Sequence, residues 1–232
     1  MEPTMTAPHV LLVHGASHRG SSWHLLERAL AARGIRCATV DLPSASPELG
    51  DLHADVEAIR SALDAVPAHE PAMVICHSYG GMPSTEAVAG SSSVSRIVYL
   101  AAYMPDAGET LLDLVDEGDD SDWAISDDGL TISAVDPARL FYNRCPPAVA
   151  AEAIRDLAPQ SLASFEQSVQ DAAWRDIPSS YVVCTDDRAI PPHVQRRMAA
   201  RATTTTSIDS DHSPFLSMPD RLADLLVELL GA

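Results

Sequence analysis

The sequence contains no lysine. All 15 of its basic residues are arginine, and they face 33 acidic residues, so the formal net charge is −18 at pH 7. Without lysine the chain cannot form a lysine Schiff base, bind phosphate through a phosphate-loop lysine or use lysine as a general acid. The excess of negative charge argues against binding to DNA, RNA or an anionic membrane, because the phosphate-driven part of such binding would be repulsive.

Cysteine motifs and long apolar runs are also absent. The four cysteines, Cys37, Cys76, Cys145 and Cys184, form no Cys-x-x-Cys pair, which excludes the usual zinc and thioredoxin-like spacings and argues against a disulfide scaffold. No run of 18 apolar residues predicts a membrane span, and the N-terminal MEPTMTAPHV lacks the features of a signal peptide. We therefore expect a cytoplasmic protein with no cofactor and no metal.

The 232 residues, 46% apolar and 21% charged, suit one globular domain. Short apolar β-rich runs alternate with helical patterns, which predicts an α/β fold with a mostly parallel, doubly wound sheet covered by helices on both faces. The expected strands are residues 9–14, 35–42, 72–77, 94–103, 180–184 and 203–208. The expected helices are residues 23–32, 51–66, 147–157, 161–169, 191–202 and 219–230.

The alternation stops in the middle of the chain. Residues 106–178 contain acidic loops (DEGDDSDW and ISDDG) followed by helical patterns. We interpret residues 1–105 and 179–232 as the α/β core and residues 106–178 as a small, mainly helical insertion. Open α/β sheets bind ligands at the carboxyl ends of their strands, so we expect this insertion to be a lid. Its acidic run, residues 116–128, is interpreted as solvated lid surface.

The segment AMVICHSYGG, residues 72–81, predicts a strand that turns sharply into a helix. Residues 76–80, Cys-His-Ser-Tyr-Gly, have the form small-x-Ser-x-Gly. Small residues let the strand and helix pass closely and leave the hydroxyl of Ser78 exposed at a helix N-terminus. Ser78 is therefore the candidate nucleophile. The backbone N–H groups of Tyr79 and of Ala16, in the loop after the first strand, would form an oxyanion hole.

A serine nucleophile needs a base and an acid that orients the base. Asp187 and His212 each follow an expected strand, so the order along the chain is serine, aspartate, histidine, as in α/β-hydrolases. Asp186 is the alternative acid. His193 lacks the same context, and we interpret His77 as structural.

A metal site is disfavoured. His14 and His18 are close in the sequence but lie in a loop, and no third ligand follows at a useful spacing.

Four segments resemble the family of plant methylesterases and hydroxynitrile lyases, which are α/β-hydrolases. They are residues 14–23 (HGASHRGSSW), 76–82 (CHSYGGM), 100–106 (LAAYMPD) and 183–191 (VCTDDRAIP). The resemblance covers most of the chain, including residues 140–159, and is strongest to the salicylate-binding methylesterases. It implies that this chain is a bacterial-type esterase of the family, with Asp187 as the acid and His212 as the base. The departures are Tyr79 for the usual leucine, Cys76 for glycine, and a shorter lid.

These patterns predict a serine hydrolase that cleaves small, methyl or aryl carboxylic esters through an acyl-enzyme. Lactone or thioester hydrolysis, perhydrolysis or a related acyl transfer on the same triad stays open, as does a small-molecule-binding α/β-hydrolase receptor. We expect a small-molecule ester as the partner, with no nucleic acid and no membrane, and we leave a homodimer open.

Hydroxynitrile lyase activity is disfavoured at two positions. The lyases with this triad have threonine where this chain has Gly15 and lysine where it has Ser213. Here no lysine can hold a departing cyanide, and we expect Gly15 to leave space for an ester carbonyl. Phe215 is assigned to either core or pocket. The residues that we assign to the substrate pocket are Gly15, Ser17, Tyr103, Trp123, Phe141 and Ser213.

Overall fold

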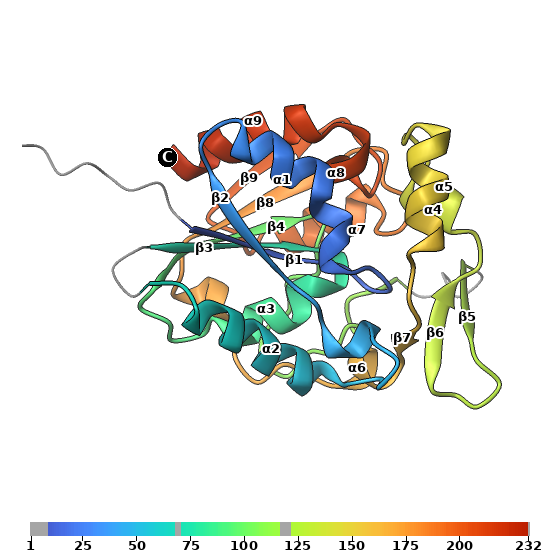
Figure 1. Ribbon diagram of the computed structural model, residues 1–232. Coiled ribbons are helices and arrows are strands. Elements are labelled where there is room, and N and C mark those ends of the chain that lie inside the picture. The colour runs from blue at the N-terminus through green and yellow to red at the C-terminus, as the bar shows by residue number, and fades with distance from the viewer. Residues whose placement is uncertain (1–8, 68–70, 117–121, 232) are drawn as a thin grey trace, which may run out of the picture.

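The computed structural model describes residues 9–67, 71–116 and 122–231. Residues 1–8, to which the signal-peptide prediction applies, and residues 117–121 of the acidic run lie outside this range. The centre of the described structure is a sheet of six parallel strands in the order β2-β1-β3-β4-β8-β9 (Figure 1). These strands are β1 His9–Val13, β2 Arg36–Val40, β3 Ala72–His77, β4 Val94–Leu100, β8 Ser179–Cys184 and β9 Thr204–Ile208.

Helices cover both faces of this sheet, as the alternating pattern predicts. In Figure 1, α1, α8 and α9 lie above the sheet, and α2 and α3 lie below it. None of the helices in the described residues is long and apolar enough to cross a membrane. The helices of the core are α1 His24–Ala31, α2 Leu52–Asp64, α3 Gly81–Ala87, α7 Pro192–Ala199, α8 Pro214–Ser217 and α9 Pro219–Gly231.

The continuous apolar character of the strands follows from this two-sided covering. Side chains of a strand point to alternate faces, so both faces of a covered sheet need apolar residues. In β1, Val10 and Leu12 pack in the cluster that includes α1 and α9. Leu11 and Val13 pack in the cluster that includes α2, and all four side chains are fully buried.

Local sequence signals account for several helix ends. Asp51 precedes α2, and its carboxylate accepts the N–H of Ala54 at 2.9 Å, which satisfies one of the free donors of the first turn. Gly34 follows α1 with φ of +76°, a conformation that glycine adopts without strain. Pro219 occupies the first position of α9.

The inserted segment, residues 106–178, is less helical than its sequence predicts. It contains a three-stranded antiparallel sheet in the order β5-β6-β7, in which the expected acidic loop forms a hairpin between β5 and β6. The expected helix at 161–169 is wrong over most of its length, because residues 160–161 pair with β6 and only a short helix follows. Its elements are β5 Trp123–Ile125, β6 Thr131–Ala134, α4 Pro137–Phe141, α5 Pro147–Arg155, β7 Gln160–Ser161 and α6 Ala163–Glu166.

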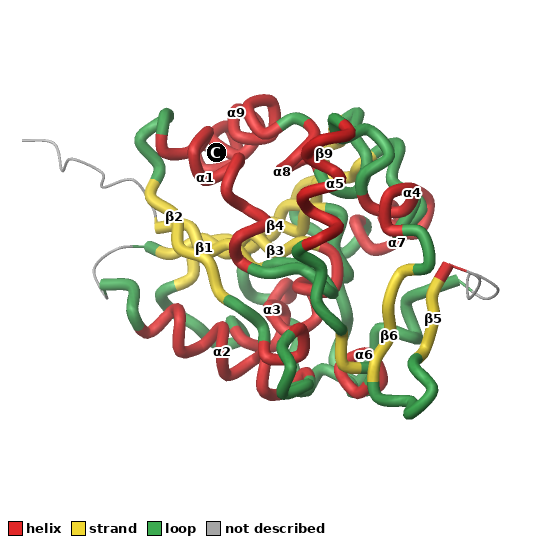
Figure 2. Tube along the Cα trace, turned by 45° about the vertical axis from the view of Figure 1, so that its right-hand side comes forward, coloured by secondary structure: helices red, strands yellow, loops and turns green. Residues whose placement is uncertain are grey.

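Figures 1 and 2 both show β5, β6 and α4 together on one side of the molecule, near α7. Since α7 follows the carboxyl end of β8, this is the sheet edge at which ligands bind in open α/β folds. The inserted segment therefore lies beside the edge that carries the candidate site residues.

Candidate active site

Ser78 lies directly after β3, on a turn that the backbone holds under strain. Its φ is +53°, a left-handed value that side-chain-bearing residues rarely adopt. A Cβ at Gly80 would lie 2.4 Å from the carbonyl oxygen of His14, so only glycine fits two residues after the serine. The N–H of Tyr103 donates to the carbonyl of Ser78 at 3.0 Å. This strained turn presents the Ser78 side chain at the carboxyl edge of the sheet.

His212 and Asp187 come together from the loops after β9 and β8. His212 Nδ1 lies 2.7 Å from Asp187 Oδ2, and both side chains are buried. Asp187 Oδ1 accepts the N–H groups of Ala189 and Ile190, and its Oδ2 also accepts from Gln195 Nε2. The carboxylate is thereby fixed in an orientation that holds the imidazole through Nδ1, so that Nε2 is the ring nitrogen left for proton transfer.

The alternative residues lie elsewhere. Asp186 is exposed and accepts from Asn143 Nδ2 at 3.2 Å. His193 is exposed, with Nε2 2.6 Å from Asp116. His77 is buried, and its Nε2 donates to the carbonyl of His212 at 2.8 Å. Burial lowers the pKa of His77 well below its ordinary value, so its neutral ring supports the His212 backbone.

The loop after β1 and the turn after β3 each leave one backbone N–H group without a partner beside Ser78. His14 Nδ1 donates to the carbonyl of Gly15 at 2.8 Å, and His18 Nδ1 donates to the carbonyl of Ala16 at 2.7 Å. Among the described residues, the N–H groups of Ala16 and Tyr79 have no hydrogen-bond partner. Both residues line the same pocket as Ser78. Two free N–H groups at this position are what an oxyanion hole requires.

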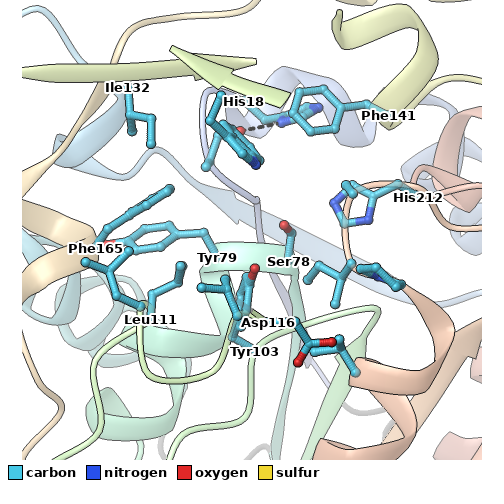
Figure 3. A pocket seen from close by; sticks show the side chains of 18 residues that line it. His18, Ser78, Tyr79, Tyr103, Leu111, Asp116, Ile132, Phe141, Phe165 and His212 are labelled. Carbon is cyan, nitrogen blue, oxygen red and sulfur yellow. Dashed lines mark hydrogen bonds between the residues drawn. The ribbon is translucent and has the colours of Figure 1, made fainter. Parts of the chain in front are cut away.

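The pocket above Ser78 has mainly apolar and aromatic walls. Figure 3 shows Ser78 between Tyr79 and His212, with His18 and Phe141 on the opposite wall. Of the described residues that line the pocket, Asp116 is the one with an acidic side chain. The lining residues are Ala16, His18, Ser78, Tyr79, Tyr103, Leu111, Leu112, Val115, Asp116, Trp123, Ile132, Phe141, Phe165, Ala189, Ile190, Pro191, Val194 and His212.

Half of the expected pocket residues belong to this lining and half do not. Tyr103, Trp123 and Phe141 line it, whereas Gly15, Ser17 and Ser213 do not. The expectation that Gly15 leaves room for an ester carbonyl stays a prediction. The structure shows close packing at this position: a Cβ there would lie 2.8 Å from Ser78 Cβ and 3.0 Å from His77 Nδ1.

Ser17 and Ser213 are both buried and do not belong to the pocket lining. Ser17 N–H donates to Gln160 Oε1, and Ser213 N–H donates to Asp211 Oδ1, in both cases within buried backbone. Phe215 packs in the core against Trp23, with ring centroids 4.6 Å apart.

Sequence reasoning missed His18 and Gln195. The sequence offers His18 only as a possible metal ligand, whereas in the structure it forms an aromatic wall of the pocket. Its Nε2 accepts from the hydroxyl of Tyr142 at 2.8 Å, and burial lowers its pKa to about 3. Gln195 holds Asp187 from α7. Its contact with a loop eight residues earlier depends on the tertiary fold, and no local motif marks it.

The described residues contain no group of three histidine, cysteine, aspartate or glutamate side chains that could hold a metal ion. His14 is fully engaged, since its Nε2 accepts the N–H of Leu42 at 3.0 Å while Nδ1 donates to Gly15. Burial lowers its pKa to about 4, which keeps this ring neutral.

Comparison with known proteins gives concordant results. The sequence profile of the alpha/beta hydrolase family matches residues 10–225. The chain is 30% identical over 245 residues to the alpha/beta hydrolase nvfD of Aspergillus novofumigatus, covering 98% of each chain. It is 25% identical over 250 residues to methylesterase 1 of Arabidopsis thaliana, covering 95% of each. A solved methylesterase structure from Arabidopsis superposes with a TM-score of 0.83 at 24% identity, covering 97% of this chain and 99% of that one.

Proposed function

Since the chain belongs to the alpha/beta hydrolase family, we propose that it is a serine carboxylic ester hydrolase with Ser78, His212 and Asp187 as its catalytic triad. One observation carries the proposal. A serine on a strained turn, a histidine held by a buried carboxylate and two unpaired backbone N–H groups meet in one apolar pocket. The relative named as a methylesterase, which is similar over nearly its whole length, supports the same chemistry.

The geometry supports an acyl-enzyme route. Ser78 Oγ attacks the ester carbonyl while His212 Nε2 accepts its proton, and the N–H groups of Ala16 and Tyr79 donate to the developing oxyanion. The protonated His212 then gives its proton to the departing alcohol. Water attacks the acyl-enzyme by the same steps and releases the carboxylic acid. Asp187 fixes the His212 tautomer and stabilises the imidazolium.

The pocket favours neutral esters with apolar or aromatic groups. The ring nitrogens of His18 and the hydroxyl of Tyr79 are already hydrogen-bonded within the protein, so these side chains present carbon surfaces to a ligand. Asp116 at the pocket wall disfavours substrates that carry a carboxylate. The inserted segment, which contributes Trp123, Phe141 and other lining residues, acts as the lid that excludes water from the acyl group.

Ser78→Ala tests the proposal. We expect kcat for 4-nitrophenyl butyrate to fall by about four or more orders of magnitude with the circular dichroism spectrum unchanged. Ser84→Ala, a buried serine in α3 that does not line the pocket, is the matched control and should keep its activity. A Ser78→Ala variant with a tenth or more of the wild-type kcat refutes the proposal.

A substrate panel separates esters from the alternatives. We expect aryl and methyl esters to have a higher kcat/KM than lactones or thioesters of the same acyl group. A preference for lactones or thioesters would keep the triad and reassign the substrate. A wild-type protein that turns over none of them but binds apolar ligands would indicate a small-molecule receptor.

A further inference from the structure

Gln160 is a buried amide that joins the inserted segment to the loop after β1. It lies in β7 and is 1% exposed. Its Oε1 accepts the N–H of Ser17 at 3.0 Å, and its Nε2 donates to the hydroxyls of Ser44 at 2.9 Å and Ser164 at 2.8 Å. These partners use the oxygen and both N–H donors of the amide, so its orientation is fixed.

The bond from Gln160 acts on a strained residue next to an oxyanion donor. Ser17 has φ of +62°, a value that persists only where the surroundings enforce it. Its carbonyl also accepts from the inserted segment, through the N–H of Ala158 at 2.8 Å. The N–H of Ser17 belongs to the same peptide group as the carbonyl of Ala16, which His18 holds. Together these bonds fix the peptide that follows the Ala16 N–H.

The same network reaches the other oxyanion donor. Ser44 donates its hydroxyl to Asp55 Oδ2 at 2.5 Å and its N–H to Asp55 Oδ1 at 2.8 Å. The hydroxyl of Tyr79 donates to Asp55 Oδ2 at 2.6 Å. A continuous buried path therefore runs from Gln160 through Ser44 and Asp55 to the side chain of Tyr79, a residue that lines the same pocket as Ser78.

The protons of this path have one consistent arrangement. The proton of Ser44 goes to Asp55, so the lone pairs of its oxygen are free to accept from Gln160. Asp55 receives three donors, which suits the ionised carboxylate. Burial opposes that charge and raises the pKa of Asp55 to about 6, so the path depends on every donor being present.

We propose that Gln160 is a positioning residue through which the inserted segment sets the geometry of both oxyanion donors, Ala16 and Tyr79. The inference rests on the proposed esterase function and adds a residue that touches neither the substrate nor the triad. Loss of the network leaves the substrate pocket intact and displaces the donors, so it lowers the rate of the chemical step more than it weakens substrate binding.

Gln160→Met removes the network with little change in volume. Gln167→Met is the matched control: Gln167 lies in the same inserted segment, and its Oε1 accepts a core N–H, that of Leu52, at 2.8 Å, away from the oxyanion loop. With active sites titrated by a fluorophosphonate, we expect kcat of Gln160→Met to fall about ten-fold with KM within two-fold. Removing a donor itself costs about 10²–10³. Gln167→Met should keep both constants within two-fold.

An oxyanion probe distinguishes positioning from a general loss of stability. An aryl trifluoromethyl ketone forms a hemiketal oxyanion on the serine, so its Ki should rise by the same factor as kcat/KM falls in Gln160→Met. A loss confined to the melting temperature, with kcat and Ki per titrated site within two-fold of wild type, overturns the proposal. So does an equal kcat loss in Gln167→Met.

Tyr79→Phe and Ser44→Ala test the path if Gln160→Met does not fold. Each should lower kcat several-fold without raising KM, and the double variant should lose less than the product of the two. Tyr99→Phe, which removes another buried hydrogen-bonded hydroxyl, is the control. Unchanged kcat in both single variants overturns the proposal. If Ser78→Ala remains active, the proposed esterase function fails, and the inference about Gln160 fails with it. If Ser78→Ala is inactive while Gln160→Met keeps the wild-type kcat, only the inference about Gln160 fails.

Discussion

Replacing Asp187 by asparagine should reverse the tautomer of His212. Asp187 Oδ1 accepts two backbone N–H groups, from Ala189 and Ile190 at 2.8 and 2.9 Å, so the asparagine oxygen must take that position. Its NH₂ group then replaces Oδ2 and faces His212 Nδ1, which lies 2.7 Å from Oδ2 in the wild type. His212 avoids two opposed donors only by accepting at Nδ1 and carrying its proton on Nε2. In that form Nε2 cannot accept the proton of Ser78.

The loss should be large because the opposite amide orientation is less favourable still. With its oxygen toward His212, the asparagine would set its NH₂ against two backbone N–H donors, whereas the expected orientation sets it against Gln195 Nε2 alone. Gln195 cannot rotate its amide to accept instead, since its Oε1 accepts the N–H of Cys184 and its Nε2 donates to the carbonyl of Ile190. We expect kcat for a nitrophenyl ester to fall by about four orders of magnitude, or ~5 kcal/mol in the activation free energy. Steady-state kinetics at pH 7.5 with titrated sites measures it.

Asp186→Asn is the control for this prediction. Asp186 is exposed and lies against Asn143, so its replacement should change kcat by less than two-fold. The reverse ranking, with Asp186→Asn inactive and Asp187→Asn active, would refute the assignment of the acid while leaving the serine mechanism in place.

Three further outcomes follow from buried groups. Burial raises the pKa of Asp55 to about 6 from its ordinary 3.8, so ionising this group costs stability as the pH rises. In urea titrations, the unfolding free energy of wild type relative to Asp55→Asn should fall by ~2 kcal/mol between pH 4 and pH 7. A difference between the two proteins that stays constant over this range would contradict the prediction. Gly15→Ala places a Cβ against Ser78 and should lower kcat at least ten-fold; near-wild-type kinetics would show that the turn adapts. Wild type should release no cyanide from mandelonitrile above the buffer rate, and Ser78-dependent release would contradict the esterase assignment.

Local sequence patterns predicted the alternating strands and helices of the core. The strands, the covering helices and the turn at Ser78 follow from apolar runs, helix-end residues and the small residues around the serine, all of which act over a few positions. Ser78, Asp187 and His212 each follow a strand of the parallel sheet, and parallel strands end on the same side, so the loops after β3, β8 and β9 lie at one edge.

The structure of the inserted segment and the contacts of residues such as Gln160 could not be predicted from the sequence. The pairing of β7 with β6 and the contacts of Gln160 join positions far apart in the chain, and no periodicity records such contacts. The close packing of Gly15 against Ser78 could not be predicted either, because it depends on how near the loop after β1 approaches that serine, a distance that the fold alone determines. His18 is of a residue type that often binds metals, but both of its ring nitrogens are hydrogen-bonded within the protein, so it forms part of the pocket wall.

The site at which a fluorophosphonate modifies the protein tests most directly whether Ser78 is the nucleophile. A fluorophosphonate reacts with a serine hydroxyl that a base has activated, and an oxyanion hole accelerates the reaction. After peptide mapping, we expect about one label per chain, located on Ser78, with esterase activity lost in proportion to labelling. The label should be absent in Ser78→Ala and slowed in Asp187→Asn. Labelling of another serine in step with the loss of activity, or full esterase activity after complete labelling of Ser78, would show that Ser78 is not the nucleophile.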